Sequence, residues 1–260
     1  MMSDSELKVL PQKKNSLRVV LSAFFEVLIL ILFVTFLLRF TTLEFLKTES
    51  DSMSPTLNKG DHVLMSRLGY YFGLGSIIPF TTLENPLKFA LWYKEPSRGD
   101  VIVFRDEDYE GDFKAIRYVT KKVDAIPGDT VNYQHFEGRT TFNLLRLEEF
   151  EDHYKKATLP AKGTEIKYSS VNSDFYISLM RSENESVFDT GKDFLVNGKS
   201  SNSYIFKNSY YFVTGENYSK SYDSRYFGPI SSERIEGKVL FRYFSENSDD
   251  GISFLNFKWL

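Results

Sequence analysis

The 260-residue sequence contains no cysteine. This absence excludes disulfide bonds, thiol nucleophiles and metal sites built on cysteine. Only three histidines are present, His62, His135 and His153, and none of them stands in a recognisable triad context. Charge of one sign is not in excess either, because 32 basic residues face 35 acidic ones. This balance argues against a general nucleic-acid binder, and no cluster of ligand residues suggests a metal or a cofactor.

One long hydrophobic run stands near the N-terminus. Residues 19–38 form a stretch of 20 residues that only one serine, one glutamate and one threonine interrupt. A helix of this length spans roughly 30 Å, the thickness of the hydrocarbon layer of a bilayer. The alternative is a cleavable signal peptide. Such peptides have apolar cores of only about 7–15 residues and a small-x-small site, which is missing from residues 39–50. We therefore predict a permanent transmembrane anchor over residues 17–40.

Basic residues flank this run unevenly, and the bias predicts its orientation. Four basic residues precede the run, whereas two follow it over a similar length (Lys8, Lys13, Lys14 and Arg18 against Arg39 and Lys47). Because positive charge is retained on the cytoplasmic side, residues 1–16 are expected to form a cytoplasmic tail. Residues 41–260 are then extracytoplasmic, in a single-pass protein of the cell (inner) membrane.

The extracytoplasmic part has mostly the periodicity of β-strands, so the predicted fold class is mainly β. Four segments carry this signal through apolar runs, alternation or branched and aromatic residues, and two of them border clear turns. The segments are residues 101–104, 116–123, 210–213 and 238–244.

Two further segments read as additions to the β core. Residues 67–96 are either a loop that lies on the membrane or a plain surface excursion. Residues 133–203 are expected to form an inserted β/α subdomain between core segments at about 41–132 and 204–260. Inside the insertion, residues 144–157 are predicted to form a short helix, since their apolar residues fall roughly on one face. The serine- and asparagine-rich composition of residues 169–203 is typical of exposed hairpins and loops.

A candidate nucleophile follows the hydrophobic run. Ser52 lies just before the Ser54-Pro55 turn, and the motif begins at Ser50, 12 residues beyond Leu38. A free hydroxyl is a poor nucleophile at neutral pH and needs a base. Without a histidine in context, the alternative base is a lysine kept neutral by burial, which can lower a lysine pKa by up to ~3–5 units. The simpler alternative is that Ser52 is only a turn hydroxyl.

Strand alternation offers Lys121 as that lysine. If residues 116–123 are extended, Lys121 shares a face with Val119 and Val123, whereas Lys122 points to the opposite face. A lysine flanked by valines is then directed toward the core. The pattern alone, however, is accounted for better by an edge-strand charge that prevents aggregation of the sheet.

Three blocks in the sequence resemble the motifs of type I signal peptidases and occur in the order of that family. The first is the serine box at residues 50–57, and the second is Lys121-Lys122-Val123 ahead of Pro127-Gly128-Asp129. The third holds Asn217, Ser221, Asp223, Ser224, Arg225 and Gly228. The resemblance covers most of the chain. It implies a signal-peptidase-like β-rich catalytic domain that removes signal peptides from exported preproteins beside the lipid bilayer.

The resemblance also implies a role for each site residue. Ser52 would be the nucleophile and Lys121 the general base of a Ser–Lys dyad that cuts after small residues. The Ser50 hydroxyl and the Ser52 N–H would form the oxyanion hole, and Ser221 would orient the lysine amine. A structural ion pair, Asp223 with Arg225, would support the loop. Met53 would line the substrate cleft, unless it simply packs in the core. No metal and no cofactor would be required.

Several positions depart from the family pattern, although none of them removes a reacting group. They are Glu49 and Asp51 around the first serine, Lys122, Asp124 and Ala125 after the lysine, and Glu216 and Tyr218 around the asparagine. These departures indicate a divergent member. They also keep open a non-catalytic or specialised paralogue that binds exported chains without cutting them. A self-cleaving repressor with the same dyad is disfavoured, because the chain has a hydrophobic span and no DNA-binding helical domain.

Overall fold

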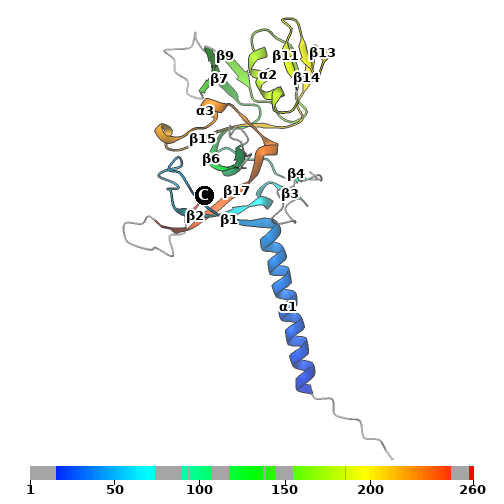
Figure 1. Ribbon diagram of the computed structural model, residues 1–260, viewed down its shortest axis with the longest axis vertical. Coiled ribbons are helices and arrows are strands. Elements are labelled where there is room, and N and C mark those ends of the chain that lie inside the picture. Colours follow the sequence, from blue (N-terminus) through cyan, green and yellow to red (C-terminus); the bar gives the residue numbers. More distant parts are fainter. Residues whose placement is uncertain are drawn as a thin grey trace, which may run out of the picture.

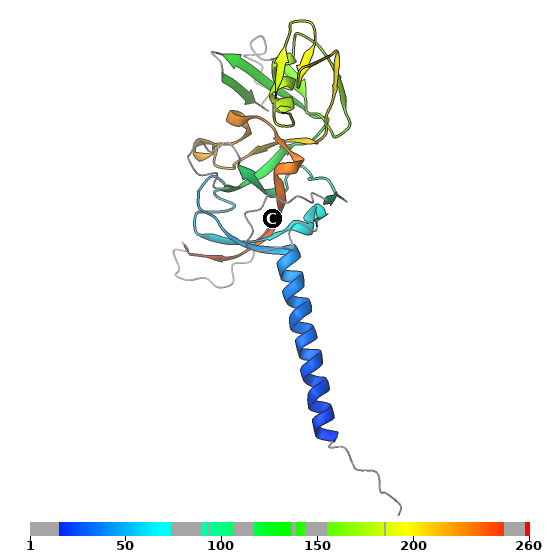
Figure 2. The same ribbon diagram turned by 45° about the vertical axis from the view of Figure 1, so that its right-hand side comes forward.

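The computed structural model describes residues 16–73, 90–92, 94–106, 117–136, 139–143, 155–184, 186–246 and 258–260. It begins with α1 (Ser16–Thr42), a helix of 27 residues that projects away from the rest of the chain in both views (Figure 1 and Figure 2). From Val19 to Val34 its large apolar side chains are exposed, for example Ile29 at 64%. Within the described residues, no helix combines the length and the apolarity needed to cross a membrane. The anchor stays a prediction.

The centre of the molecule is an antiparallel sheet of eight strands. Seven of them run in the order β1-β2-β17-β5-β6-β15-β16, and β18 pairs with β17. Their bounds are β1 (Leu43–Lys47), β2 (Asp61–Ser66), β5 (Val101–Asp106), β6 (Arg117–Ala125), β15 (Tyr210–Thr214), β16 (Ile230–Ser231), β17 (Ile235–Ser245) and β18 (Lys258–Trp259). The four strands predicted from the sequence are therefore confirmed as β5, β6, β15 and β17, with β6 continuing two residues beyond its predicted end.

This sheet buries apolar side chains on both faces. Along β5, Ile102 and Phe104 belong to one core cluster, whereas Val101 and Val103 belong to another. Successive side chains of a strand point to opposite faces, so the uninterrupted apolar run of β5 supplies two cores at once. β5 is therefore buried on both faces, and β6 pairs with it along its length.

Smaller sheets and short helices lie at the end of the molecule opposite α1 or flank the central sheet (Figure 1). The sheets are β3-β4 (Tyr71–Gly73, Ala90–Trp92), β8-β7-β9 (Arg139–Asn143, Thr130–Phe136, Lys155–Thr158), β10-β14 (Glu165–Lys167, Ser203–Ile205) and β11-β12-β13 (Val187–Asp189, Phe194–Val196, Lys199–Ser201). The helices are α2 (Ser173–Arg181), α3 (Ser224–Phe227) and the 3₁₀ turns η1 (Arg67–Gly69), η4 (Tyr218–Lys220) and η5 (Ser232–Arg234).

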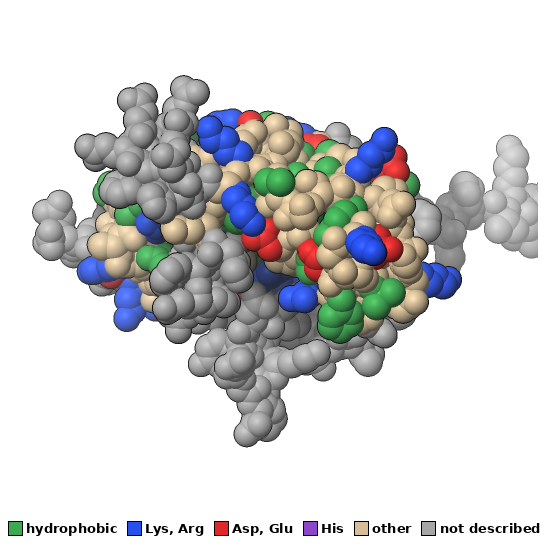
Figure 3. All heavy atoms as spheres, turned by 90° about the horizontal axis from the view of Figure 1, so that it is seen from above, with side chains coloured by type: hydrophobic (Ala, Val, Ile, Leu, Met, Phe, Trp, Pro, Cys, Tyr) green, Lys and Arg blue, Asp and Glu red, His purple; other side chains and the backbone are tan. Residues whose placement is uncertain are grey.

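A third core cluster joins these small sheets to the central sheet. It contains Ala125 of β6 and Phe212 of β15 together with Tyr133, Phe142 and residues of α2. On the face farthest from α1, basic and acidic side chains are interspersed among apolar ones (Figure 3).

The predicted helix over residues 144–157 is wrong at its C-terminal end. Residues 155–158 form β9, which pairs with β7 through Val131 and Ala157, and residues 144–154 lie outside the described residues. Pairing with β7 overrides the local pattern there. The expected surface or membrane loop at 67–96 is described only at its ends, where β3 pairs with β4.

A helix that was not predicted, α2, lies within the serine- and asparagine-rich stretch. Phe175, Tyr176, Leu179 and Met180 are buried and share one face of this helix. The polar residues around this nine-residue segment dominate the composition of residues 169–203, which is why composition alone indicated hairpins. The hairpins themselves are present as β11-β12-β13.

Candidate active site

Ser52 lies in a loop, residues 48–60, whose two ends are tied together. Thr48 N–H donates to Asp61 O at 2.8 Å, and Gly60 N–H donates to Thr48 O at 2.8 Å. Inside the loop, Met53 and Leu57 are fully buried in the core cluster that also contains Val101 and Val103. Two apolar side chains therefore fasten the loop to the sheet beside β5, and Ser52 itself is 5% exposed.

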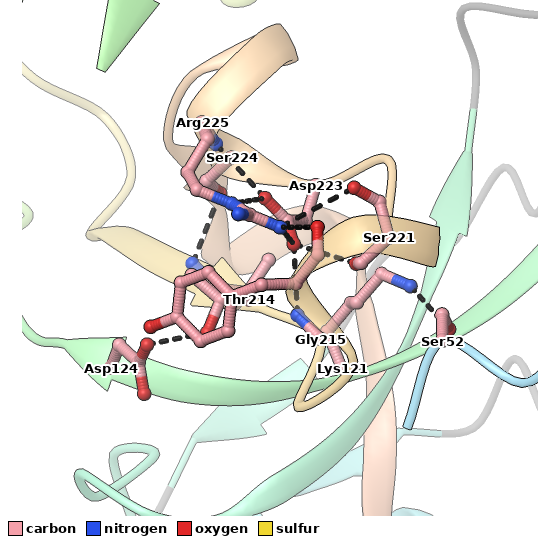
Figure 4. A network of polar contacts seen from close by, with 11 residues as sticks. Ser52, Lys121, Asp124, Thr214, Gly215, Ser221, Asp223, Ser224 and Arg225 are labelled. Atoms are coloured by element: carbon pink, nitrogen blue, oxygen red, sulfur yellow. Dashed lines mark hydrogen bonds and ion pairs between the residues drawn. The ribbon is translucent and has the colours of Figure 1, made fainter. Parts of the chain in front are cut away.

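Lys121 comes from β6, the neighbour of β5, and is buried with 3% of its surface exposed. The alternation predicted from the sequence is present, because Val123 is buried on the same side and Tyr118 is exposed on the other. The Lys121 Nζ donates to Ser52 Oγ at 2.7 Å (Figure 4). A buried amine in hydrogen-bond contact with a buried hydroxyl is the arrangement that removal of the hydroxyl proton requires.

Ser50 lies on the exposed side of the same loop. Its Oγ is 3.1 Å from Ser52 Oγ, so the two hydroxyls are hydrogen-bonded. The structure therefore brings together the predicted residues Ser50, Ser52 and Lys121. A donor at the position of Ser50 is close enough to contact an atom bonded to Ser52 Oγ.

A second loop, residues 215–223, closes against Ser52 from the end of β15. Asn217 N–H donates to Ser52 O at 3.0 Å. Gly215 is tightly enclosed, since a methyl group at its Cα would overlap both Ser221 Oγ and Ser52 O. Only glycine permits this close approach of the loop to Ser52. Ser221, in the same loop, is 5% exposed and lies next to Gly215.

Asp223 organises that loop from inside. It is fully buried and accepts hydrogen bonds from Ser221 Oγ at 2.6 Å and Gly215 N–H at 2.9 Å. Arg225 binds both of its oxygens, with Nε to Oδ1 at 2.8 Å and Nη2 to Oδ2 at 2.9 Å. The predicted pair of Asp223 with Arg225 is thus a bidentate ion pair, the geometry that gives an arginine–carboxylate contact its strength.

The pKa of Asp223 reflects these opposing effects. Burial acts to raise it, but hydrogen bonds from Arg225, Gly215 N–H and Ser221 outweigh burial and lower the pKa below its ordinary value. The Asp223 carboxylate is therefore ionised and accepts a hydrogen bond from the Ser221 hydroxyl. Because its hydrogen points to Asp223, the Ser221 hydroxyl keeps its lone pairs for an amine donor.

Met53 has no exposed surface. It packs with Leu57, Val63 and Val101 beneath the loop, so the structure gives it the core-packing role rather than a place in the wall of a cleft. Of the two roles left open for Met53 by the sequence, its burial favours packing in the core. Sequence alone does not distinguish a cleft wall from a buried support.

Several departures from the family pattern contact one another or a site residue. Lys122 pairs with Glu216 at 3.5 Å, and Tyr218 lies under the Arg225 guanidinium at 4.3 Å from ring centroid to Cζ. Asp124 accepts a hydrogen bond from Thr214 Oγ1 (Figure 4). The sequence analysis did not predict this contact of Thr214 or the close approach of Gly215 to Ser52. An isolated glycine directly after the strand at 210–214 was the available signal.

Within the described ranges, no three His, Asp or Glu side chains gather in a way that could hold a metal ion. His62 instead lies 3.0 Å from Glu246. His153 lies outside the described residues. The site presents a hydroxyl, a buried amine and hydrogen-bond donors, an arrangement suited to acyl transfer.

Comparison with known proteins assigns the chain to a family. The family model described as signal peptidase, peptidase S26, matches residues 20–244. Since that match extends over most of the sequence, the protein belongs to the S26 signal peptidase family and is a peptidase of the signal peptidase I type.

Its relatives have low sequence identity to it, but they align over most of the chain. A signal peptidase I of Buchnera aphidicola subsp. Baizongia pistaciae is 27% identical over 248 residues, which cover 85% of this chain and 74% of the relative. Signal peptidase I V of Bacillus subtilis is 25% identical over 194 residues, or 74% of this chain and 81% of the relative. A crystal structure of a signal peptidase I from Enterococcus faecalis V583 matches at 20% identity with a TM-score of 0.24, covering 56% of this chain and 97% of that chain. This similarity is too low to assign a role to any residue of the chain.

Proposed function

We propose that this protein is a membrane-anchored serine endopeptidase that removes signal peptides from exported preproteins through a dyad of Ser52 and Lys121. The observation that carries this proposal is the 2.7 Å hydrogen bond from Lys121 Nζ to Ser52 Oγ, with both residues buried. Burial disfavours the charged ammonium form of a lysine, and only the neutral amine can accept a proton.

The reaction has two halves. In the first, Ser52 Oγ attacks the scissile carbonyl carbon while Lys121 takes the hydroxyl proton. The C–N bond then breaks, and Lys121 returns the proton to the leaving amine, which becomes the N-terminus of the mature protein. In the second, water gives a proton to Lys121 and attacks the acyl-enzyme ester. The signal peptide leaves with a new carboxylate, and Ser52 recovers its proton.

Charge that develops on the carbonyl oxygen needs donors. We assign these to the Ser50 hydroxyl and the Ser52 N–H, supported by the 3.1 Å contact between the Ser50 and Ser52 hydroxyls. Removing one such donor typically lowers the rate about 10²–10³-fold. Ser221 is assigned to orient the Lys121 amine, and the Asp223–Arg225 pair holds the Ser221 loop in place.

We further propose that α1 anchors the enzyme. Support comes from its 27 residues, its exposed apolar side chains and the 20-residue apolar sequence within it. The N-terminus would be cytoplasmic, and residues 41–260 extracytoplasmic, with the insertion at about 133–203 between two core segments. Ser52 would then work close to the outer surface of the bilayer, where a preprotein emerges beside its own apolar segment. The preferred substrates have small residues at the first and third positions before the cut.

The rival is a non-catalytic paralogue that binds exported chains. The dyad geometry disfavours it, because a protein that only binds has no need of a buried lysine against a serine. The deciding experiment incubates the full-length protein in detergent with a preprotein that carries an Ala-x-Ala site. Cleavage after the second alanine, absent in Ser52→Ala, is the expected result. Binding of the preprotein without a cleavage product would establish the rival instead.

A further inference from the structure

Asp124 occupies an irregular position on the strand that carries the proposed base. Along the β6–β15 pairing, Phe212 faces Ala125 and Val213 faces Val123, so Asp124 is the extra residue of a β-bulge. A bulge changes the direction in which the side chain of the extra residue points. Here the Asp124 carboxylate reaches across to β15 and accepts the hydroxyl hydrogen of Thr214.

Thr214 is the last residue of β15 and is 3% exposed. Gly215, the next residue, begins the loop of residues 215–223 and lies close to Ser52 O and Ser221 Oγ. Its N–H donates a hydrogen bond to Asp223. The position of Thr214 therefore sets where that loop begins. Gly215 has no side chain to lock its own conformation, so a side-chain contact at its neighbour is an effective restraint.

We propose that Asp124 and Thr214 are a positioning pair that fixes the Ser221 loop relative to Lys121. This inference rests on the proposed function, and neither residue touches the reacting atoms. Lys121 and Asp124 are three residues apart on one strand, and Thr214 and Ser221 are seven apart on the facing segment. The Asp124–Thr214 hydrogen bond connects β6 and β15 at the bulge, where Asp124 has no partner in the strand pairing. Asp124 is itself one of the departures from the family pattern, so the contact belongs to this chain in particular.

The expected consequence is an effect on turnover rather than on binding. Misplacement of catalytic groups by about 1 Å can cost on the order of 10²-fold in rate. Loss of one hydrogen bond that restrains a loop should cost less, about 10-fold in kcat. KM should change little, because the pair lies on no surface assigned to the substrate.

The test uses the full-length enzyme and an Ala-x-Ala preprotein at a temperature where circular dichroism shows each variant fully folded. Thr214→Val keeps the shape and removes the hydroxyl, and Asp124→Ala removes the acceptor at a half-buried position. Each should lower kcat about 10-fold, and the double variant should be no worse than either single variant, because both delete one contact. Thr214→Ser restores a hydroxyl and should recover most of the activity. Thr120→Val, a half-buried threonine on β6, is the matched control and should leave kcat unchanged.

Two outcomes would overturn the inference while leaving the proposed function standing. One is wild-type cleavage with unchanged kcat in both single variants. The other is an additive double variant whose losses follow thermal stability alone, which would indicate ordinary structural support. Should Thr214→Val fail to fold, Asp124→Ala tests the same hydrogen bond from its more exposed partner. An inactive wild-type protein would instead refute the proposed function and, with it, this inference.

Discussion

Lys121 Nζ and Ser52 Oγ lie 2.7 Å apart although 69 residues separate them in the chain. The contact depends on buried side chains that hold both residues against β5. The Ser52 loop is fastened by Met53 and Leu57 to the core cluster that contains Val101 and Val103 of β5. Lys121 pairs directly with Ile102 of the same strand. Because β5 supports both partners, the hydroxyl and the amine are held in place before any substrate binds.

Replacement of either dyad residue should abolish cleavage without unfolding the protein. Ser52→Ala and Lys121→Ala each remove one group of the proposed dyad. Lys121→Arg should be equally inactive, because a guanidinium does not give up its proton at usable pH. Preprotein cleavage followed by gel electrophoresis and mass spectrometry measures the effect. Lys167→Ala, at an exposed lysine of β10, should retain full activity. Substantial turnover by Lys121→Arg would remove Lys121 from the role of base.

The pH dependence of cleavage should reveal a base that acts in its neutral form. The kcat/KM value should rise with pH through the pKa of that base in the free enzyme, since the ammonium form cannot accept a proton. Initial rates measured across a series of buffers, with folding checked at each pH, give the profile. Addition of a metal chelator should not change it. A flat profile from acid to alkaline pH would contradict the dyad.

Gly215→Ala should lower the activity of the enzyme strongly while the protein still folds. The added methyl group would overlap Ser221 Oγ and Ser52 O, so the Ser221 loop has to move away from Ser52. A displacement of about 1 Å supports an expected loss on the order of 10²-fold in kcat/KM.

Gly191→Ala is the matched control for this substitution. Gly191 has φ +83 and open space around it, and it lies in the β11-β12 hairpin. Alanine there should cost about 1 kcal/mol of stability through backbone strain while cleavage stays unchanged. Equal activity of Gly215→Ala and the wild-type protein would show that close approach of the loop is not required.

The Asp223–Arg225 pair should stabilise the fold in a pH-dependent way. The folded pKa of Asp223 is lower than the ordinary value of 3.8, so its contribution to the free energy of unfolding is fully present above that value. It is lost as the pH falls through the folded pKa. Arg225→Ala leaves the buried carboxylate without its ion-pair partner and should cost about 3 kcal/mol at neutral pH.

Chemical denaturation at neutral pH and at stepwise lower pH measures both effects. The gap in unfolding free energy between the wild-type protein and Arg225→Ala should shrink as the medium becomes acidic. Arg98→Ala is the matched control, because Arg98 pairs with Asp129 at 2.8 Å but is 60% exposed. That exposed pair should contribute no more than about 1 kcal/mol. An unchanged gap down to strongly acidic pH would argue that Arg225 acts independently of the charge on Asp223.

Topology can be tested with tags at both ends of the full-length protein. Protease added to spheroplasts should remove a C-terminal tag and degrade residues 41–260, whereas an N-terminal tag should survive until detergent is added. A cytoplasmic marker protein serves as the control for intact spheroplasts. Protection of the C-terminal tag would invert the assigned orientation and separate the enzyme from its proposed substrates.

Local patterns were sufficient for part of this structure. The alternation around Lys121 predicted which side of β6 it occupies, and the branched and aromatic runs at residues 101–104 and 210–213 predicted strands. These features depend on neighbours within a few residues, and periodicity reports them directly. The serine box, the lysine and the Asp223–Arg225 pair were likewise available from sequence, because the resemblance fixes residue types at given spacings.

Tertiary structure alone decided the rest. Local patterns in the sequence do not give the 2.7 Å contact between Lys121 Nζ and Ser52 Oγ, the complete burial of Met53 or the strand that residues 155–158 form beside β7. The same holds for the bulge that directs Asp124 to Thr214 and for the enclosure of Gly215. Each of these depends on packing between segments distant in the chain, where side-chain volume and strand register, rather than local propensity, determine which atoms meet.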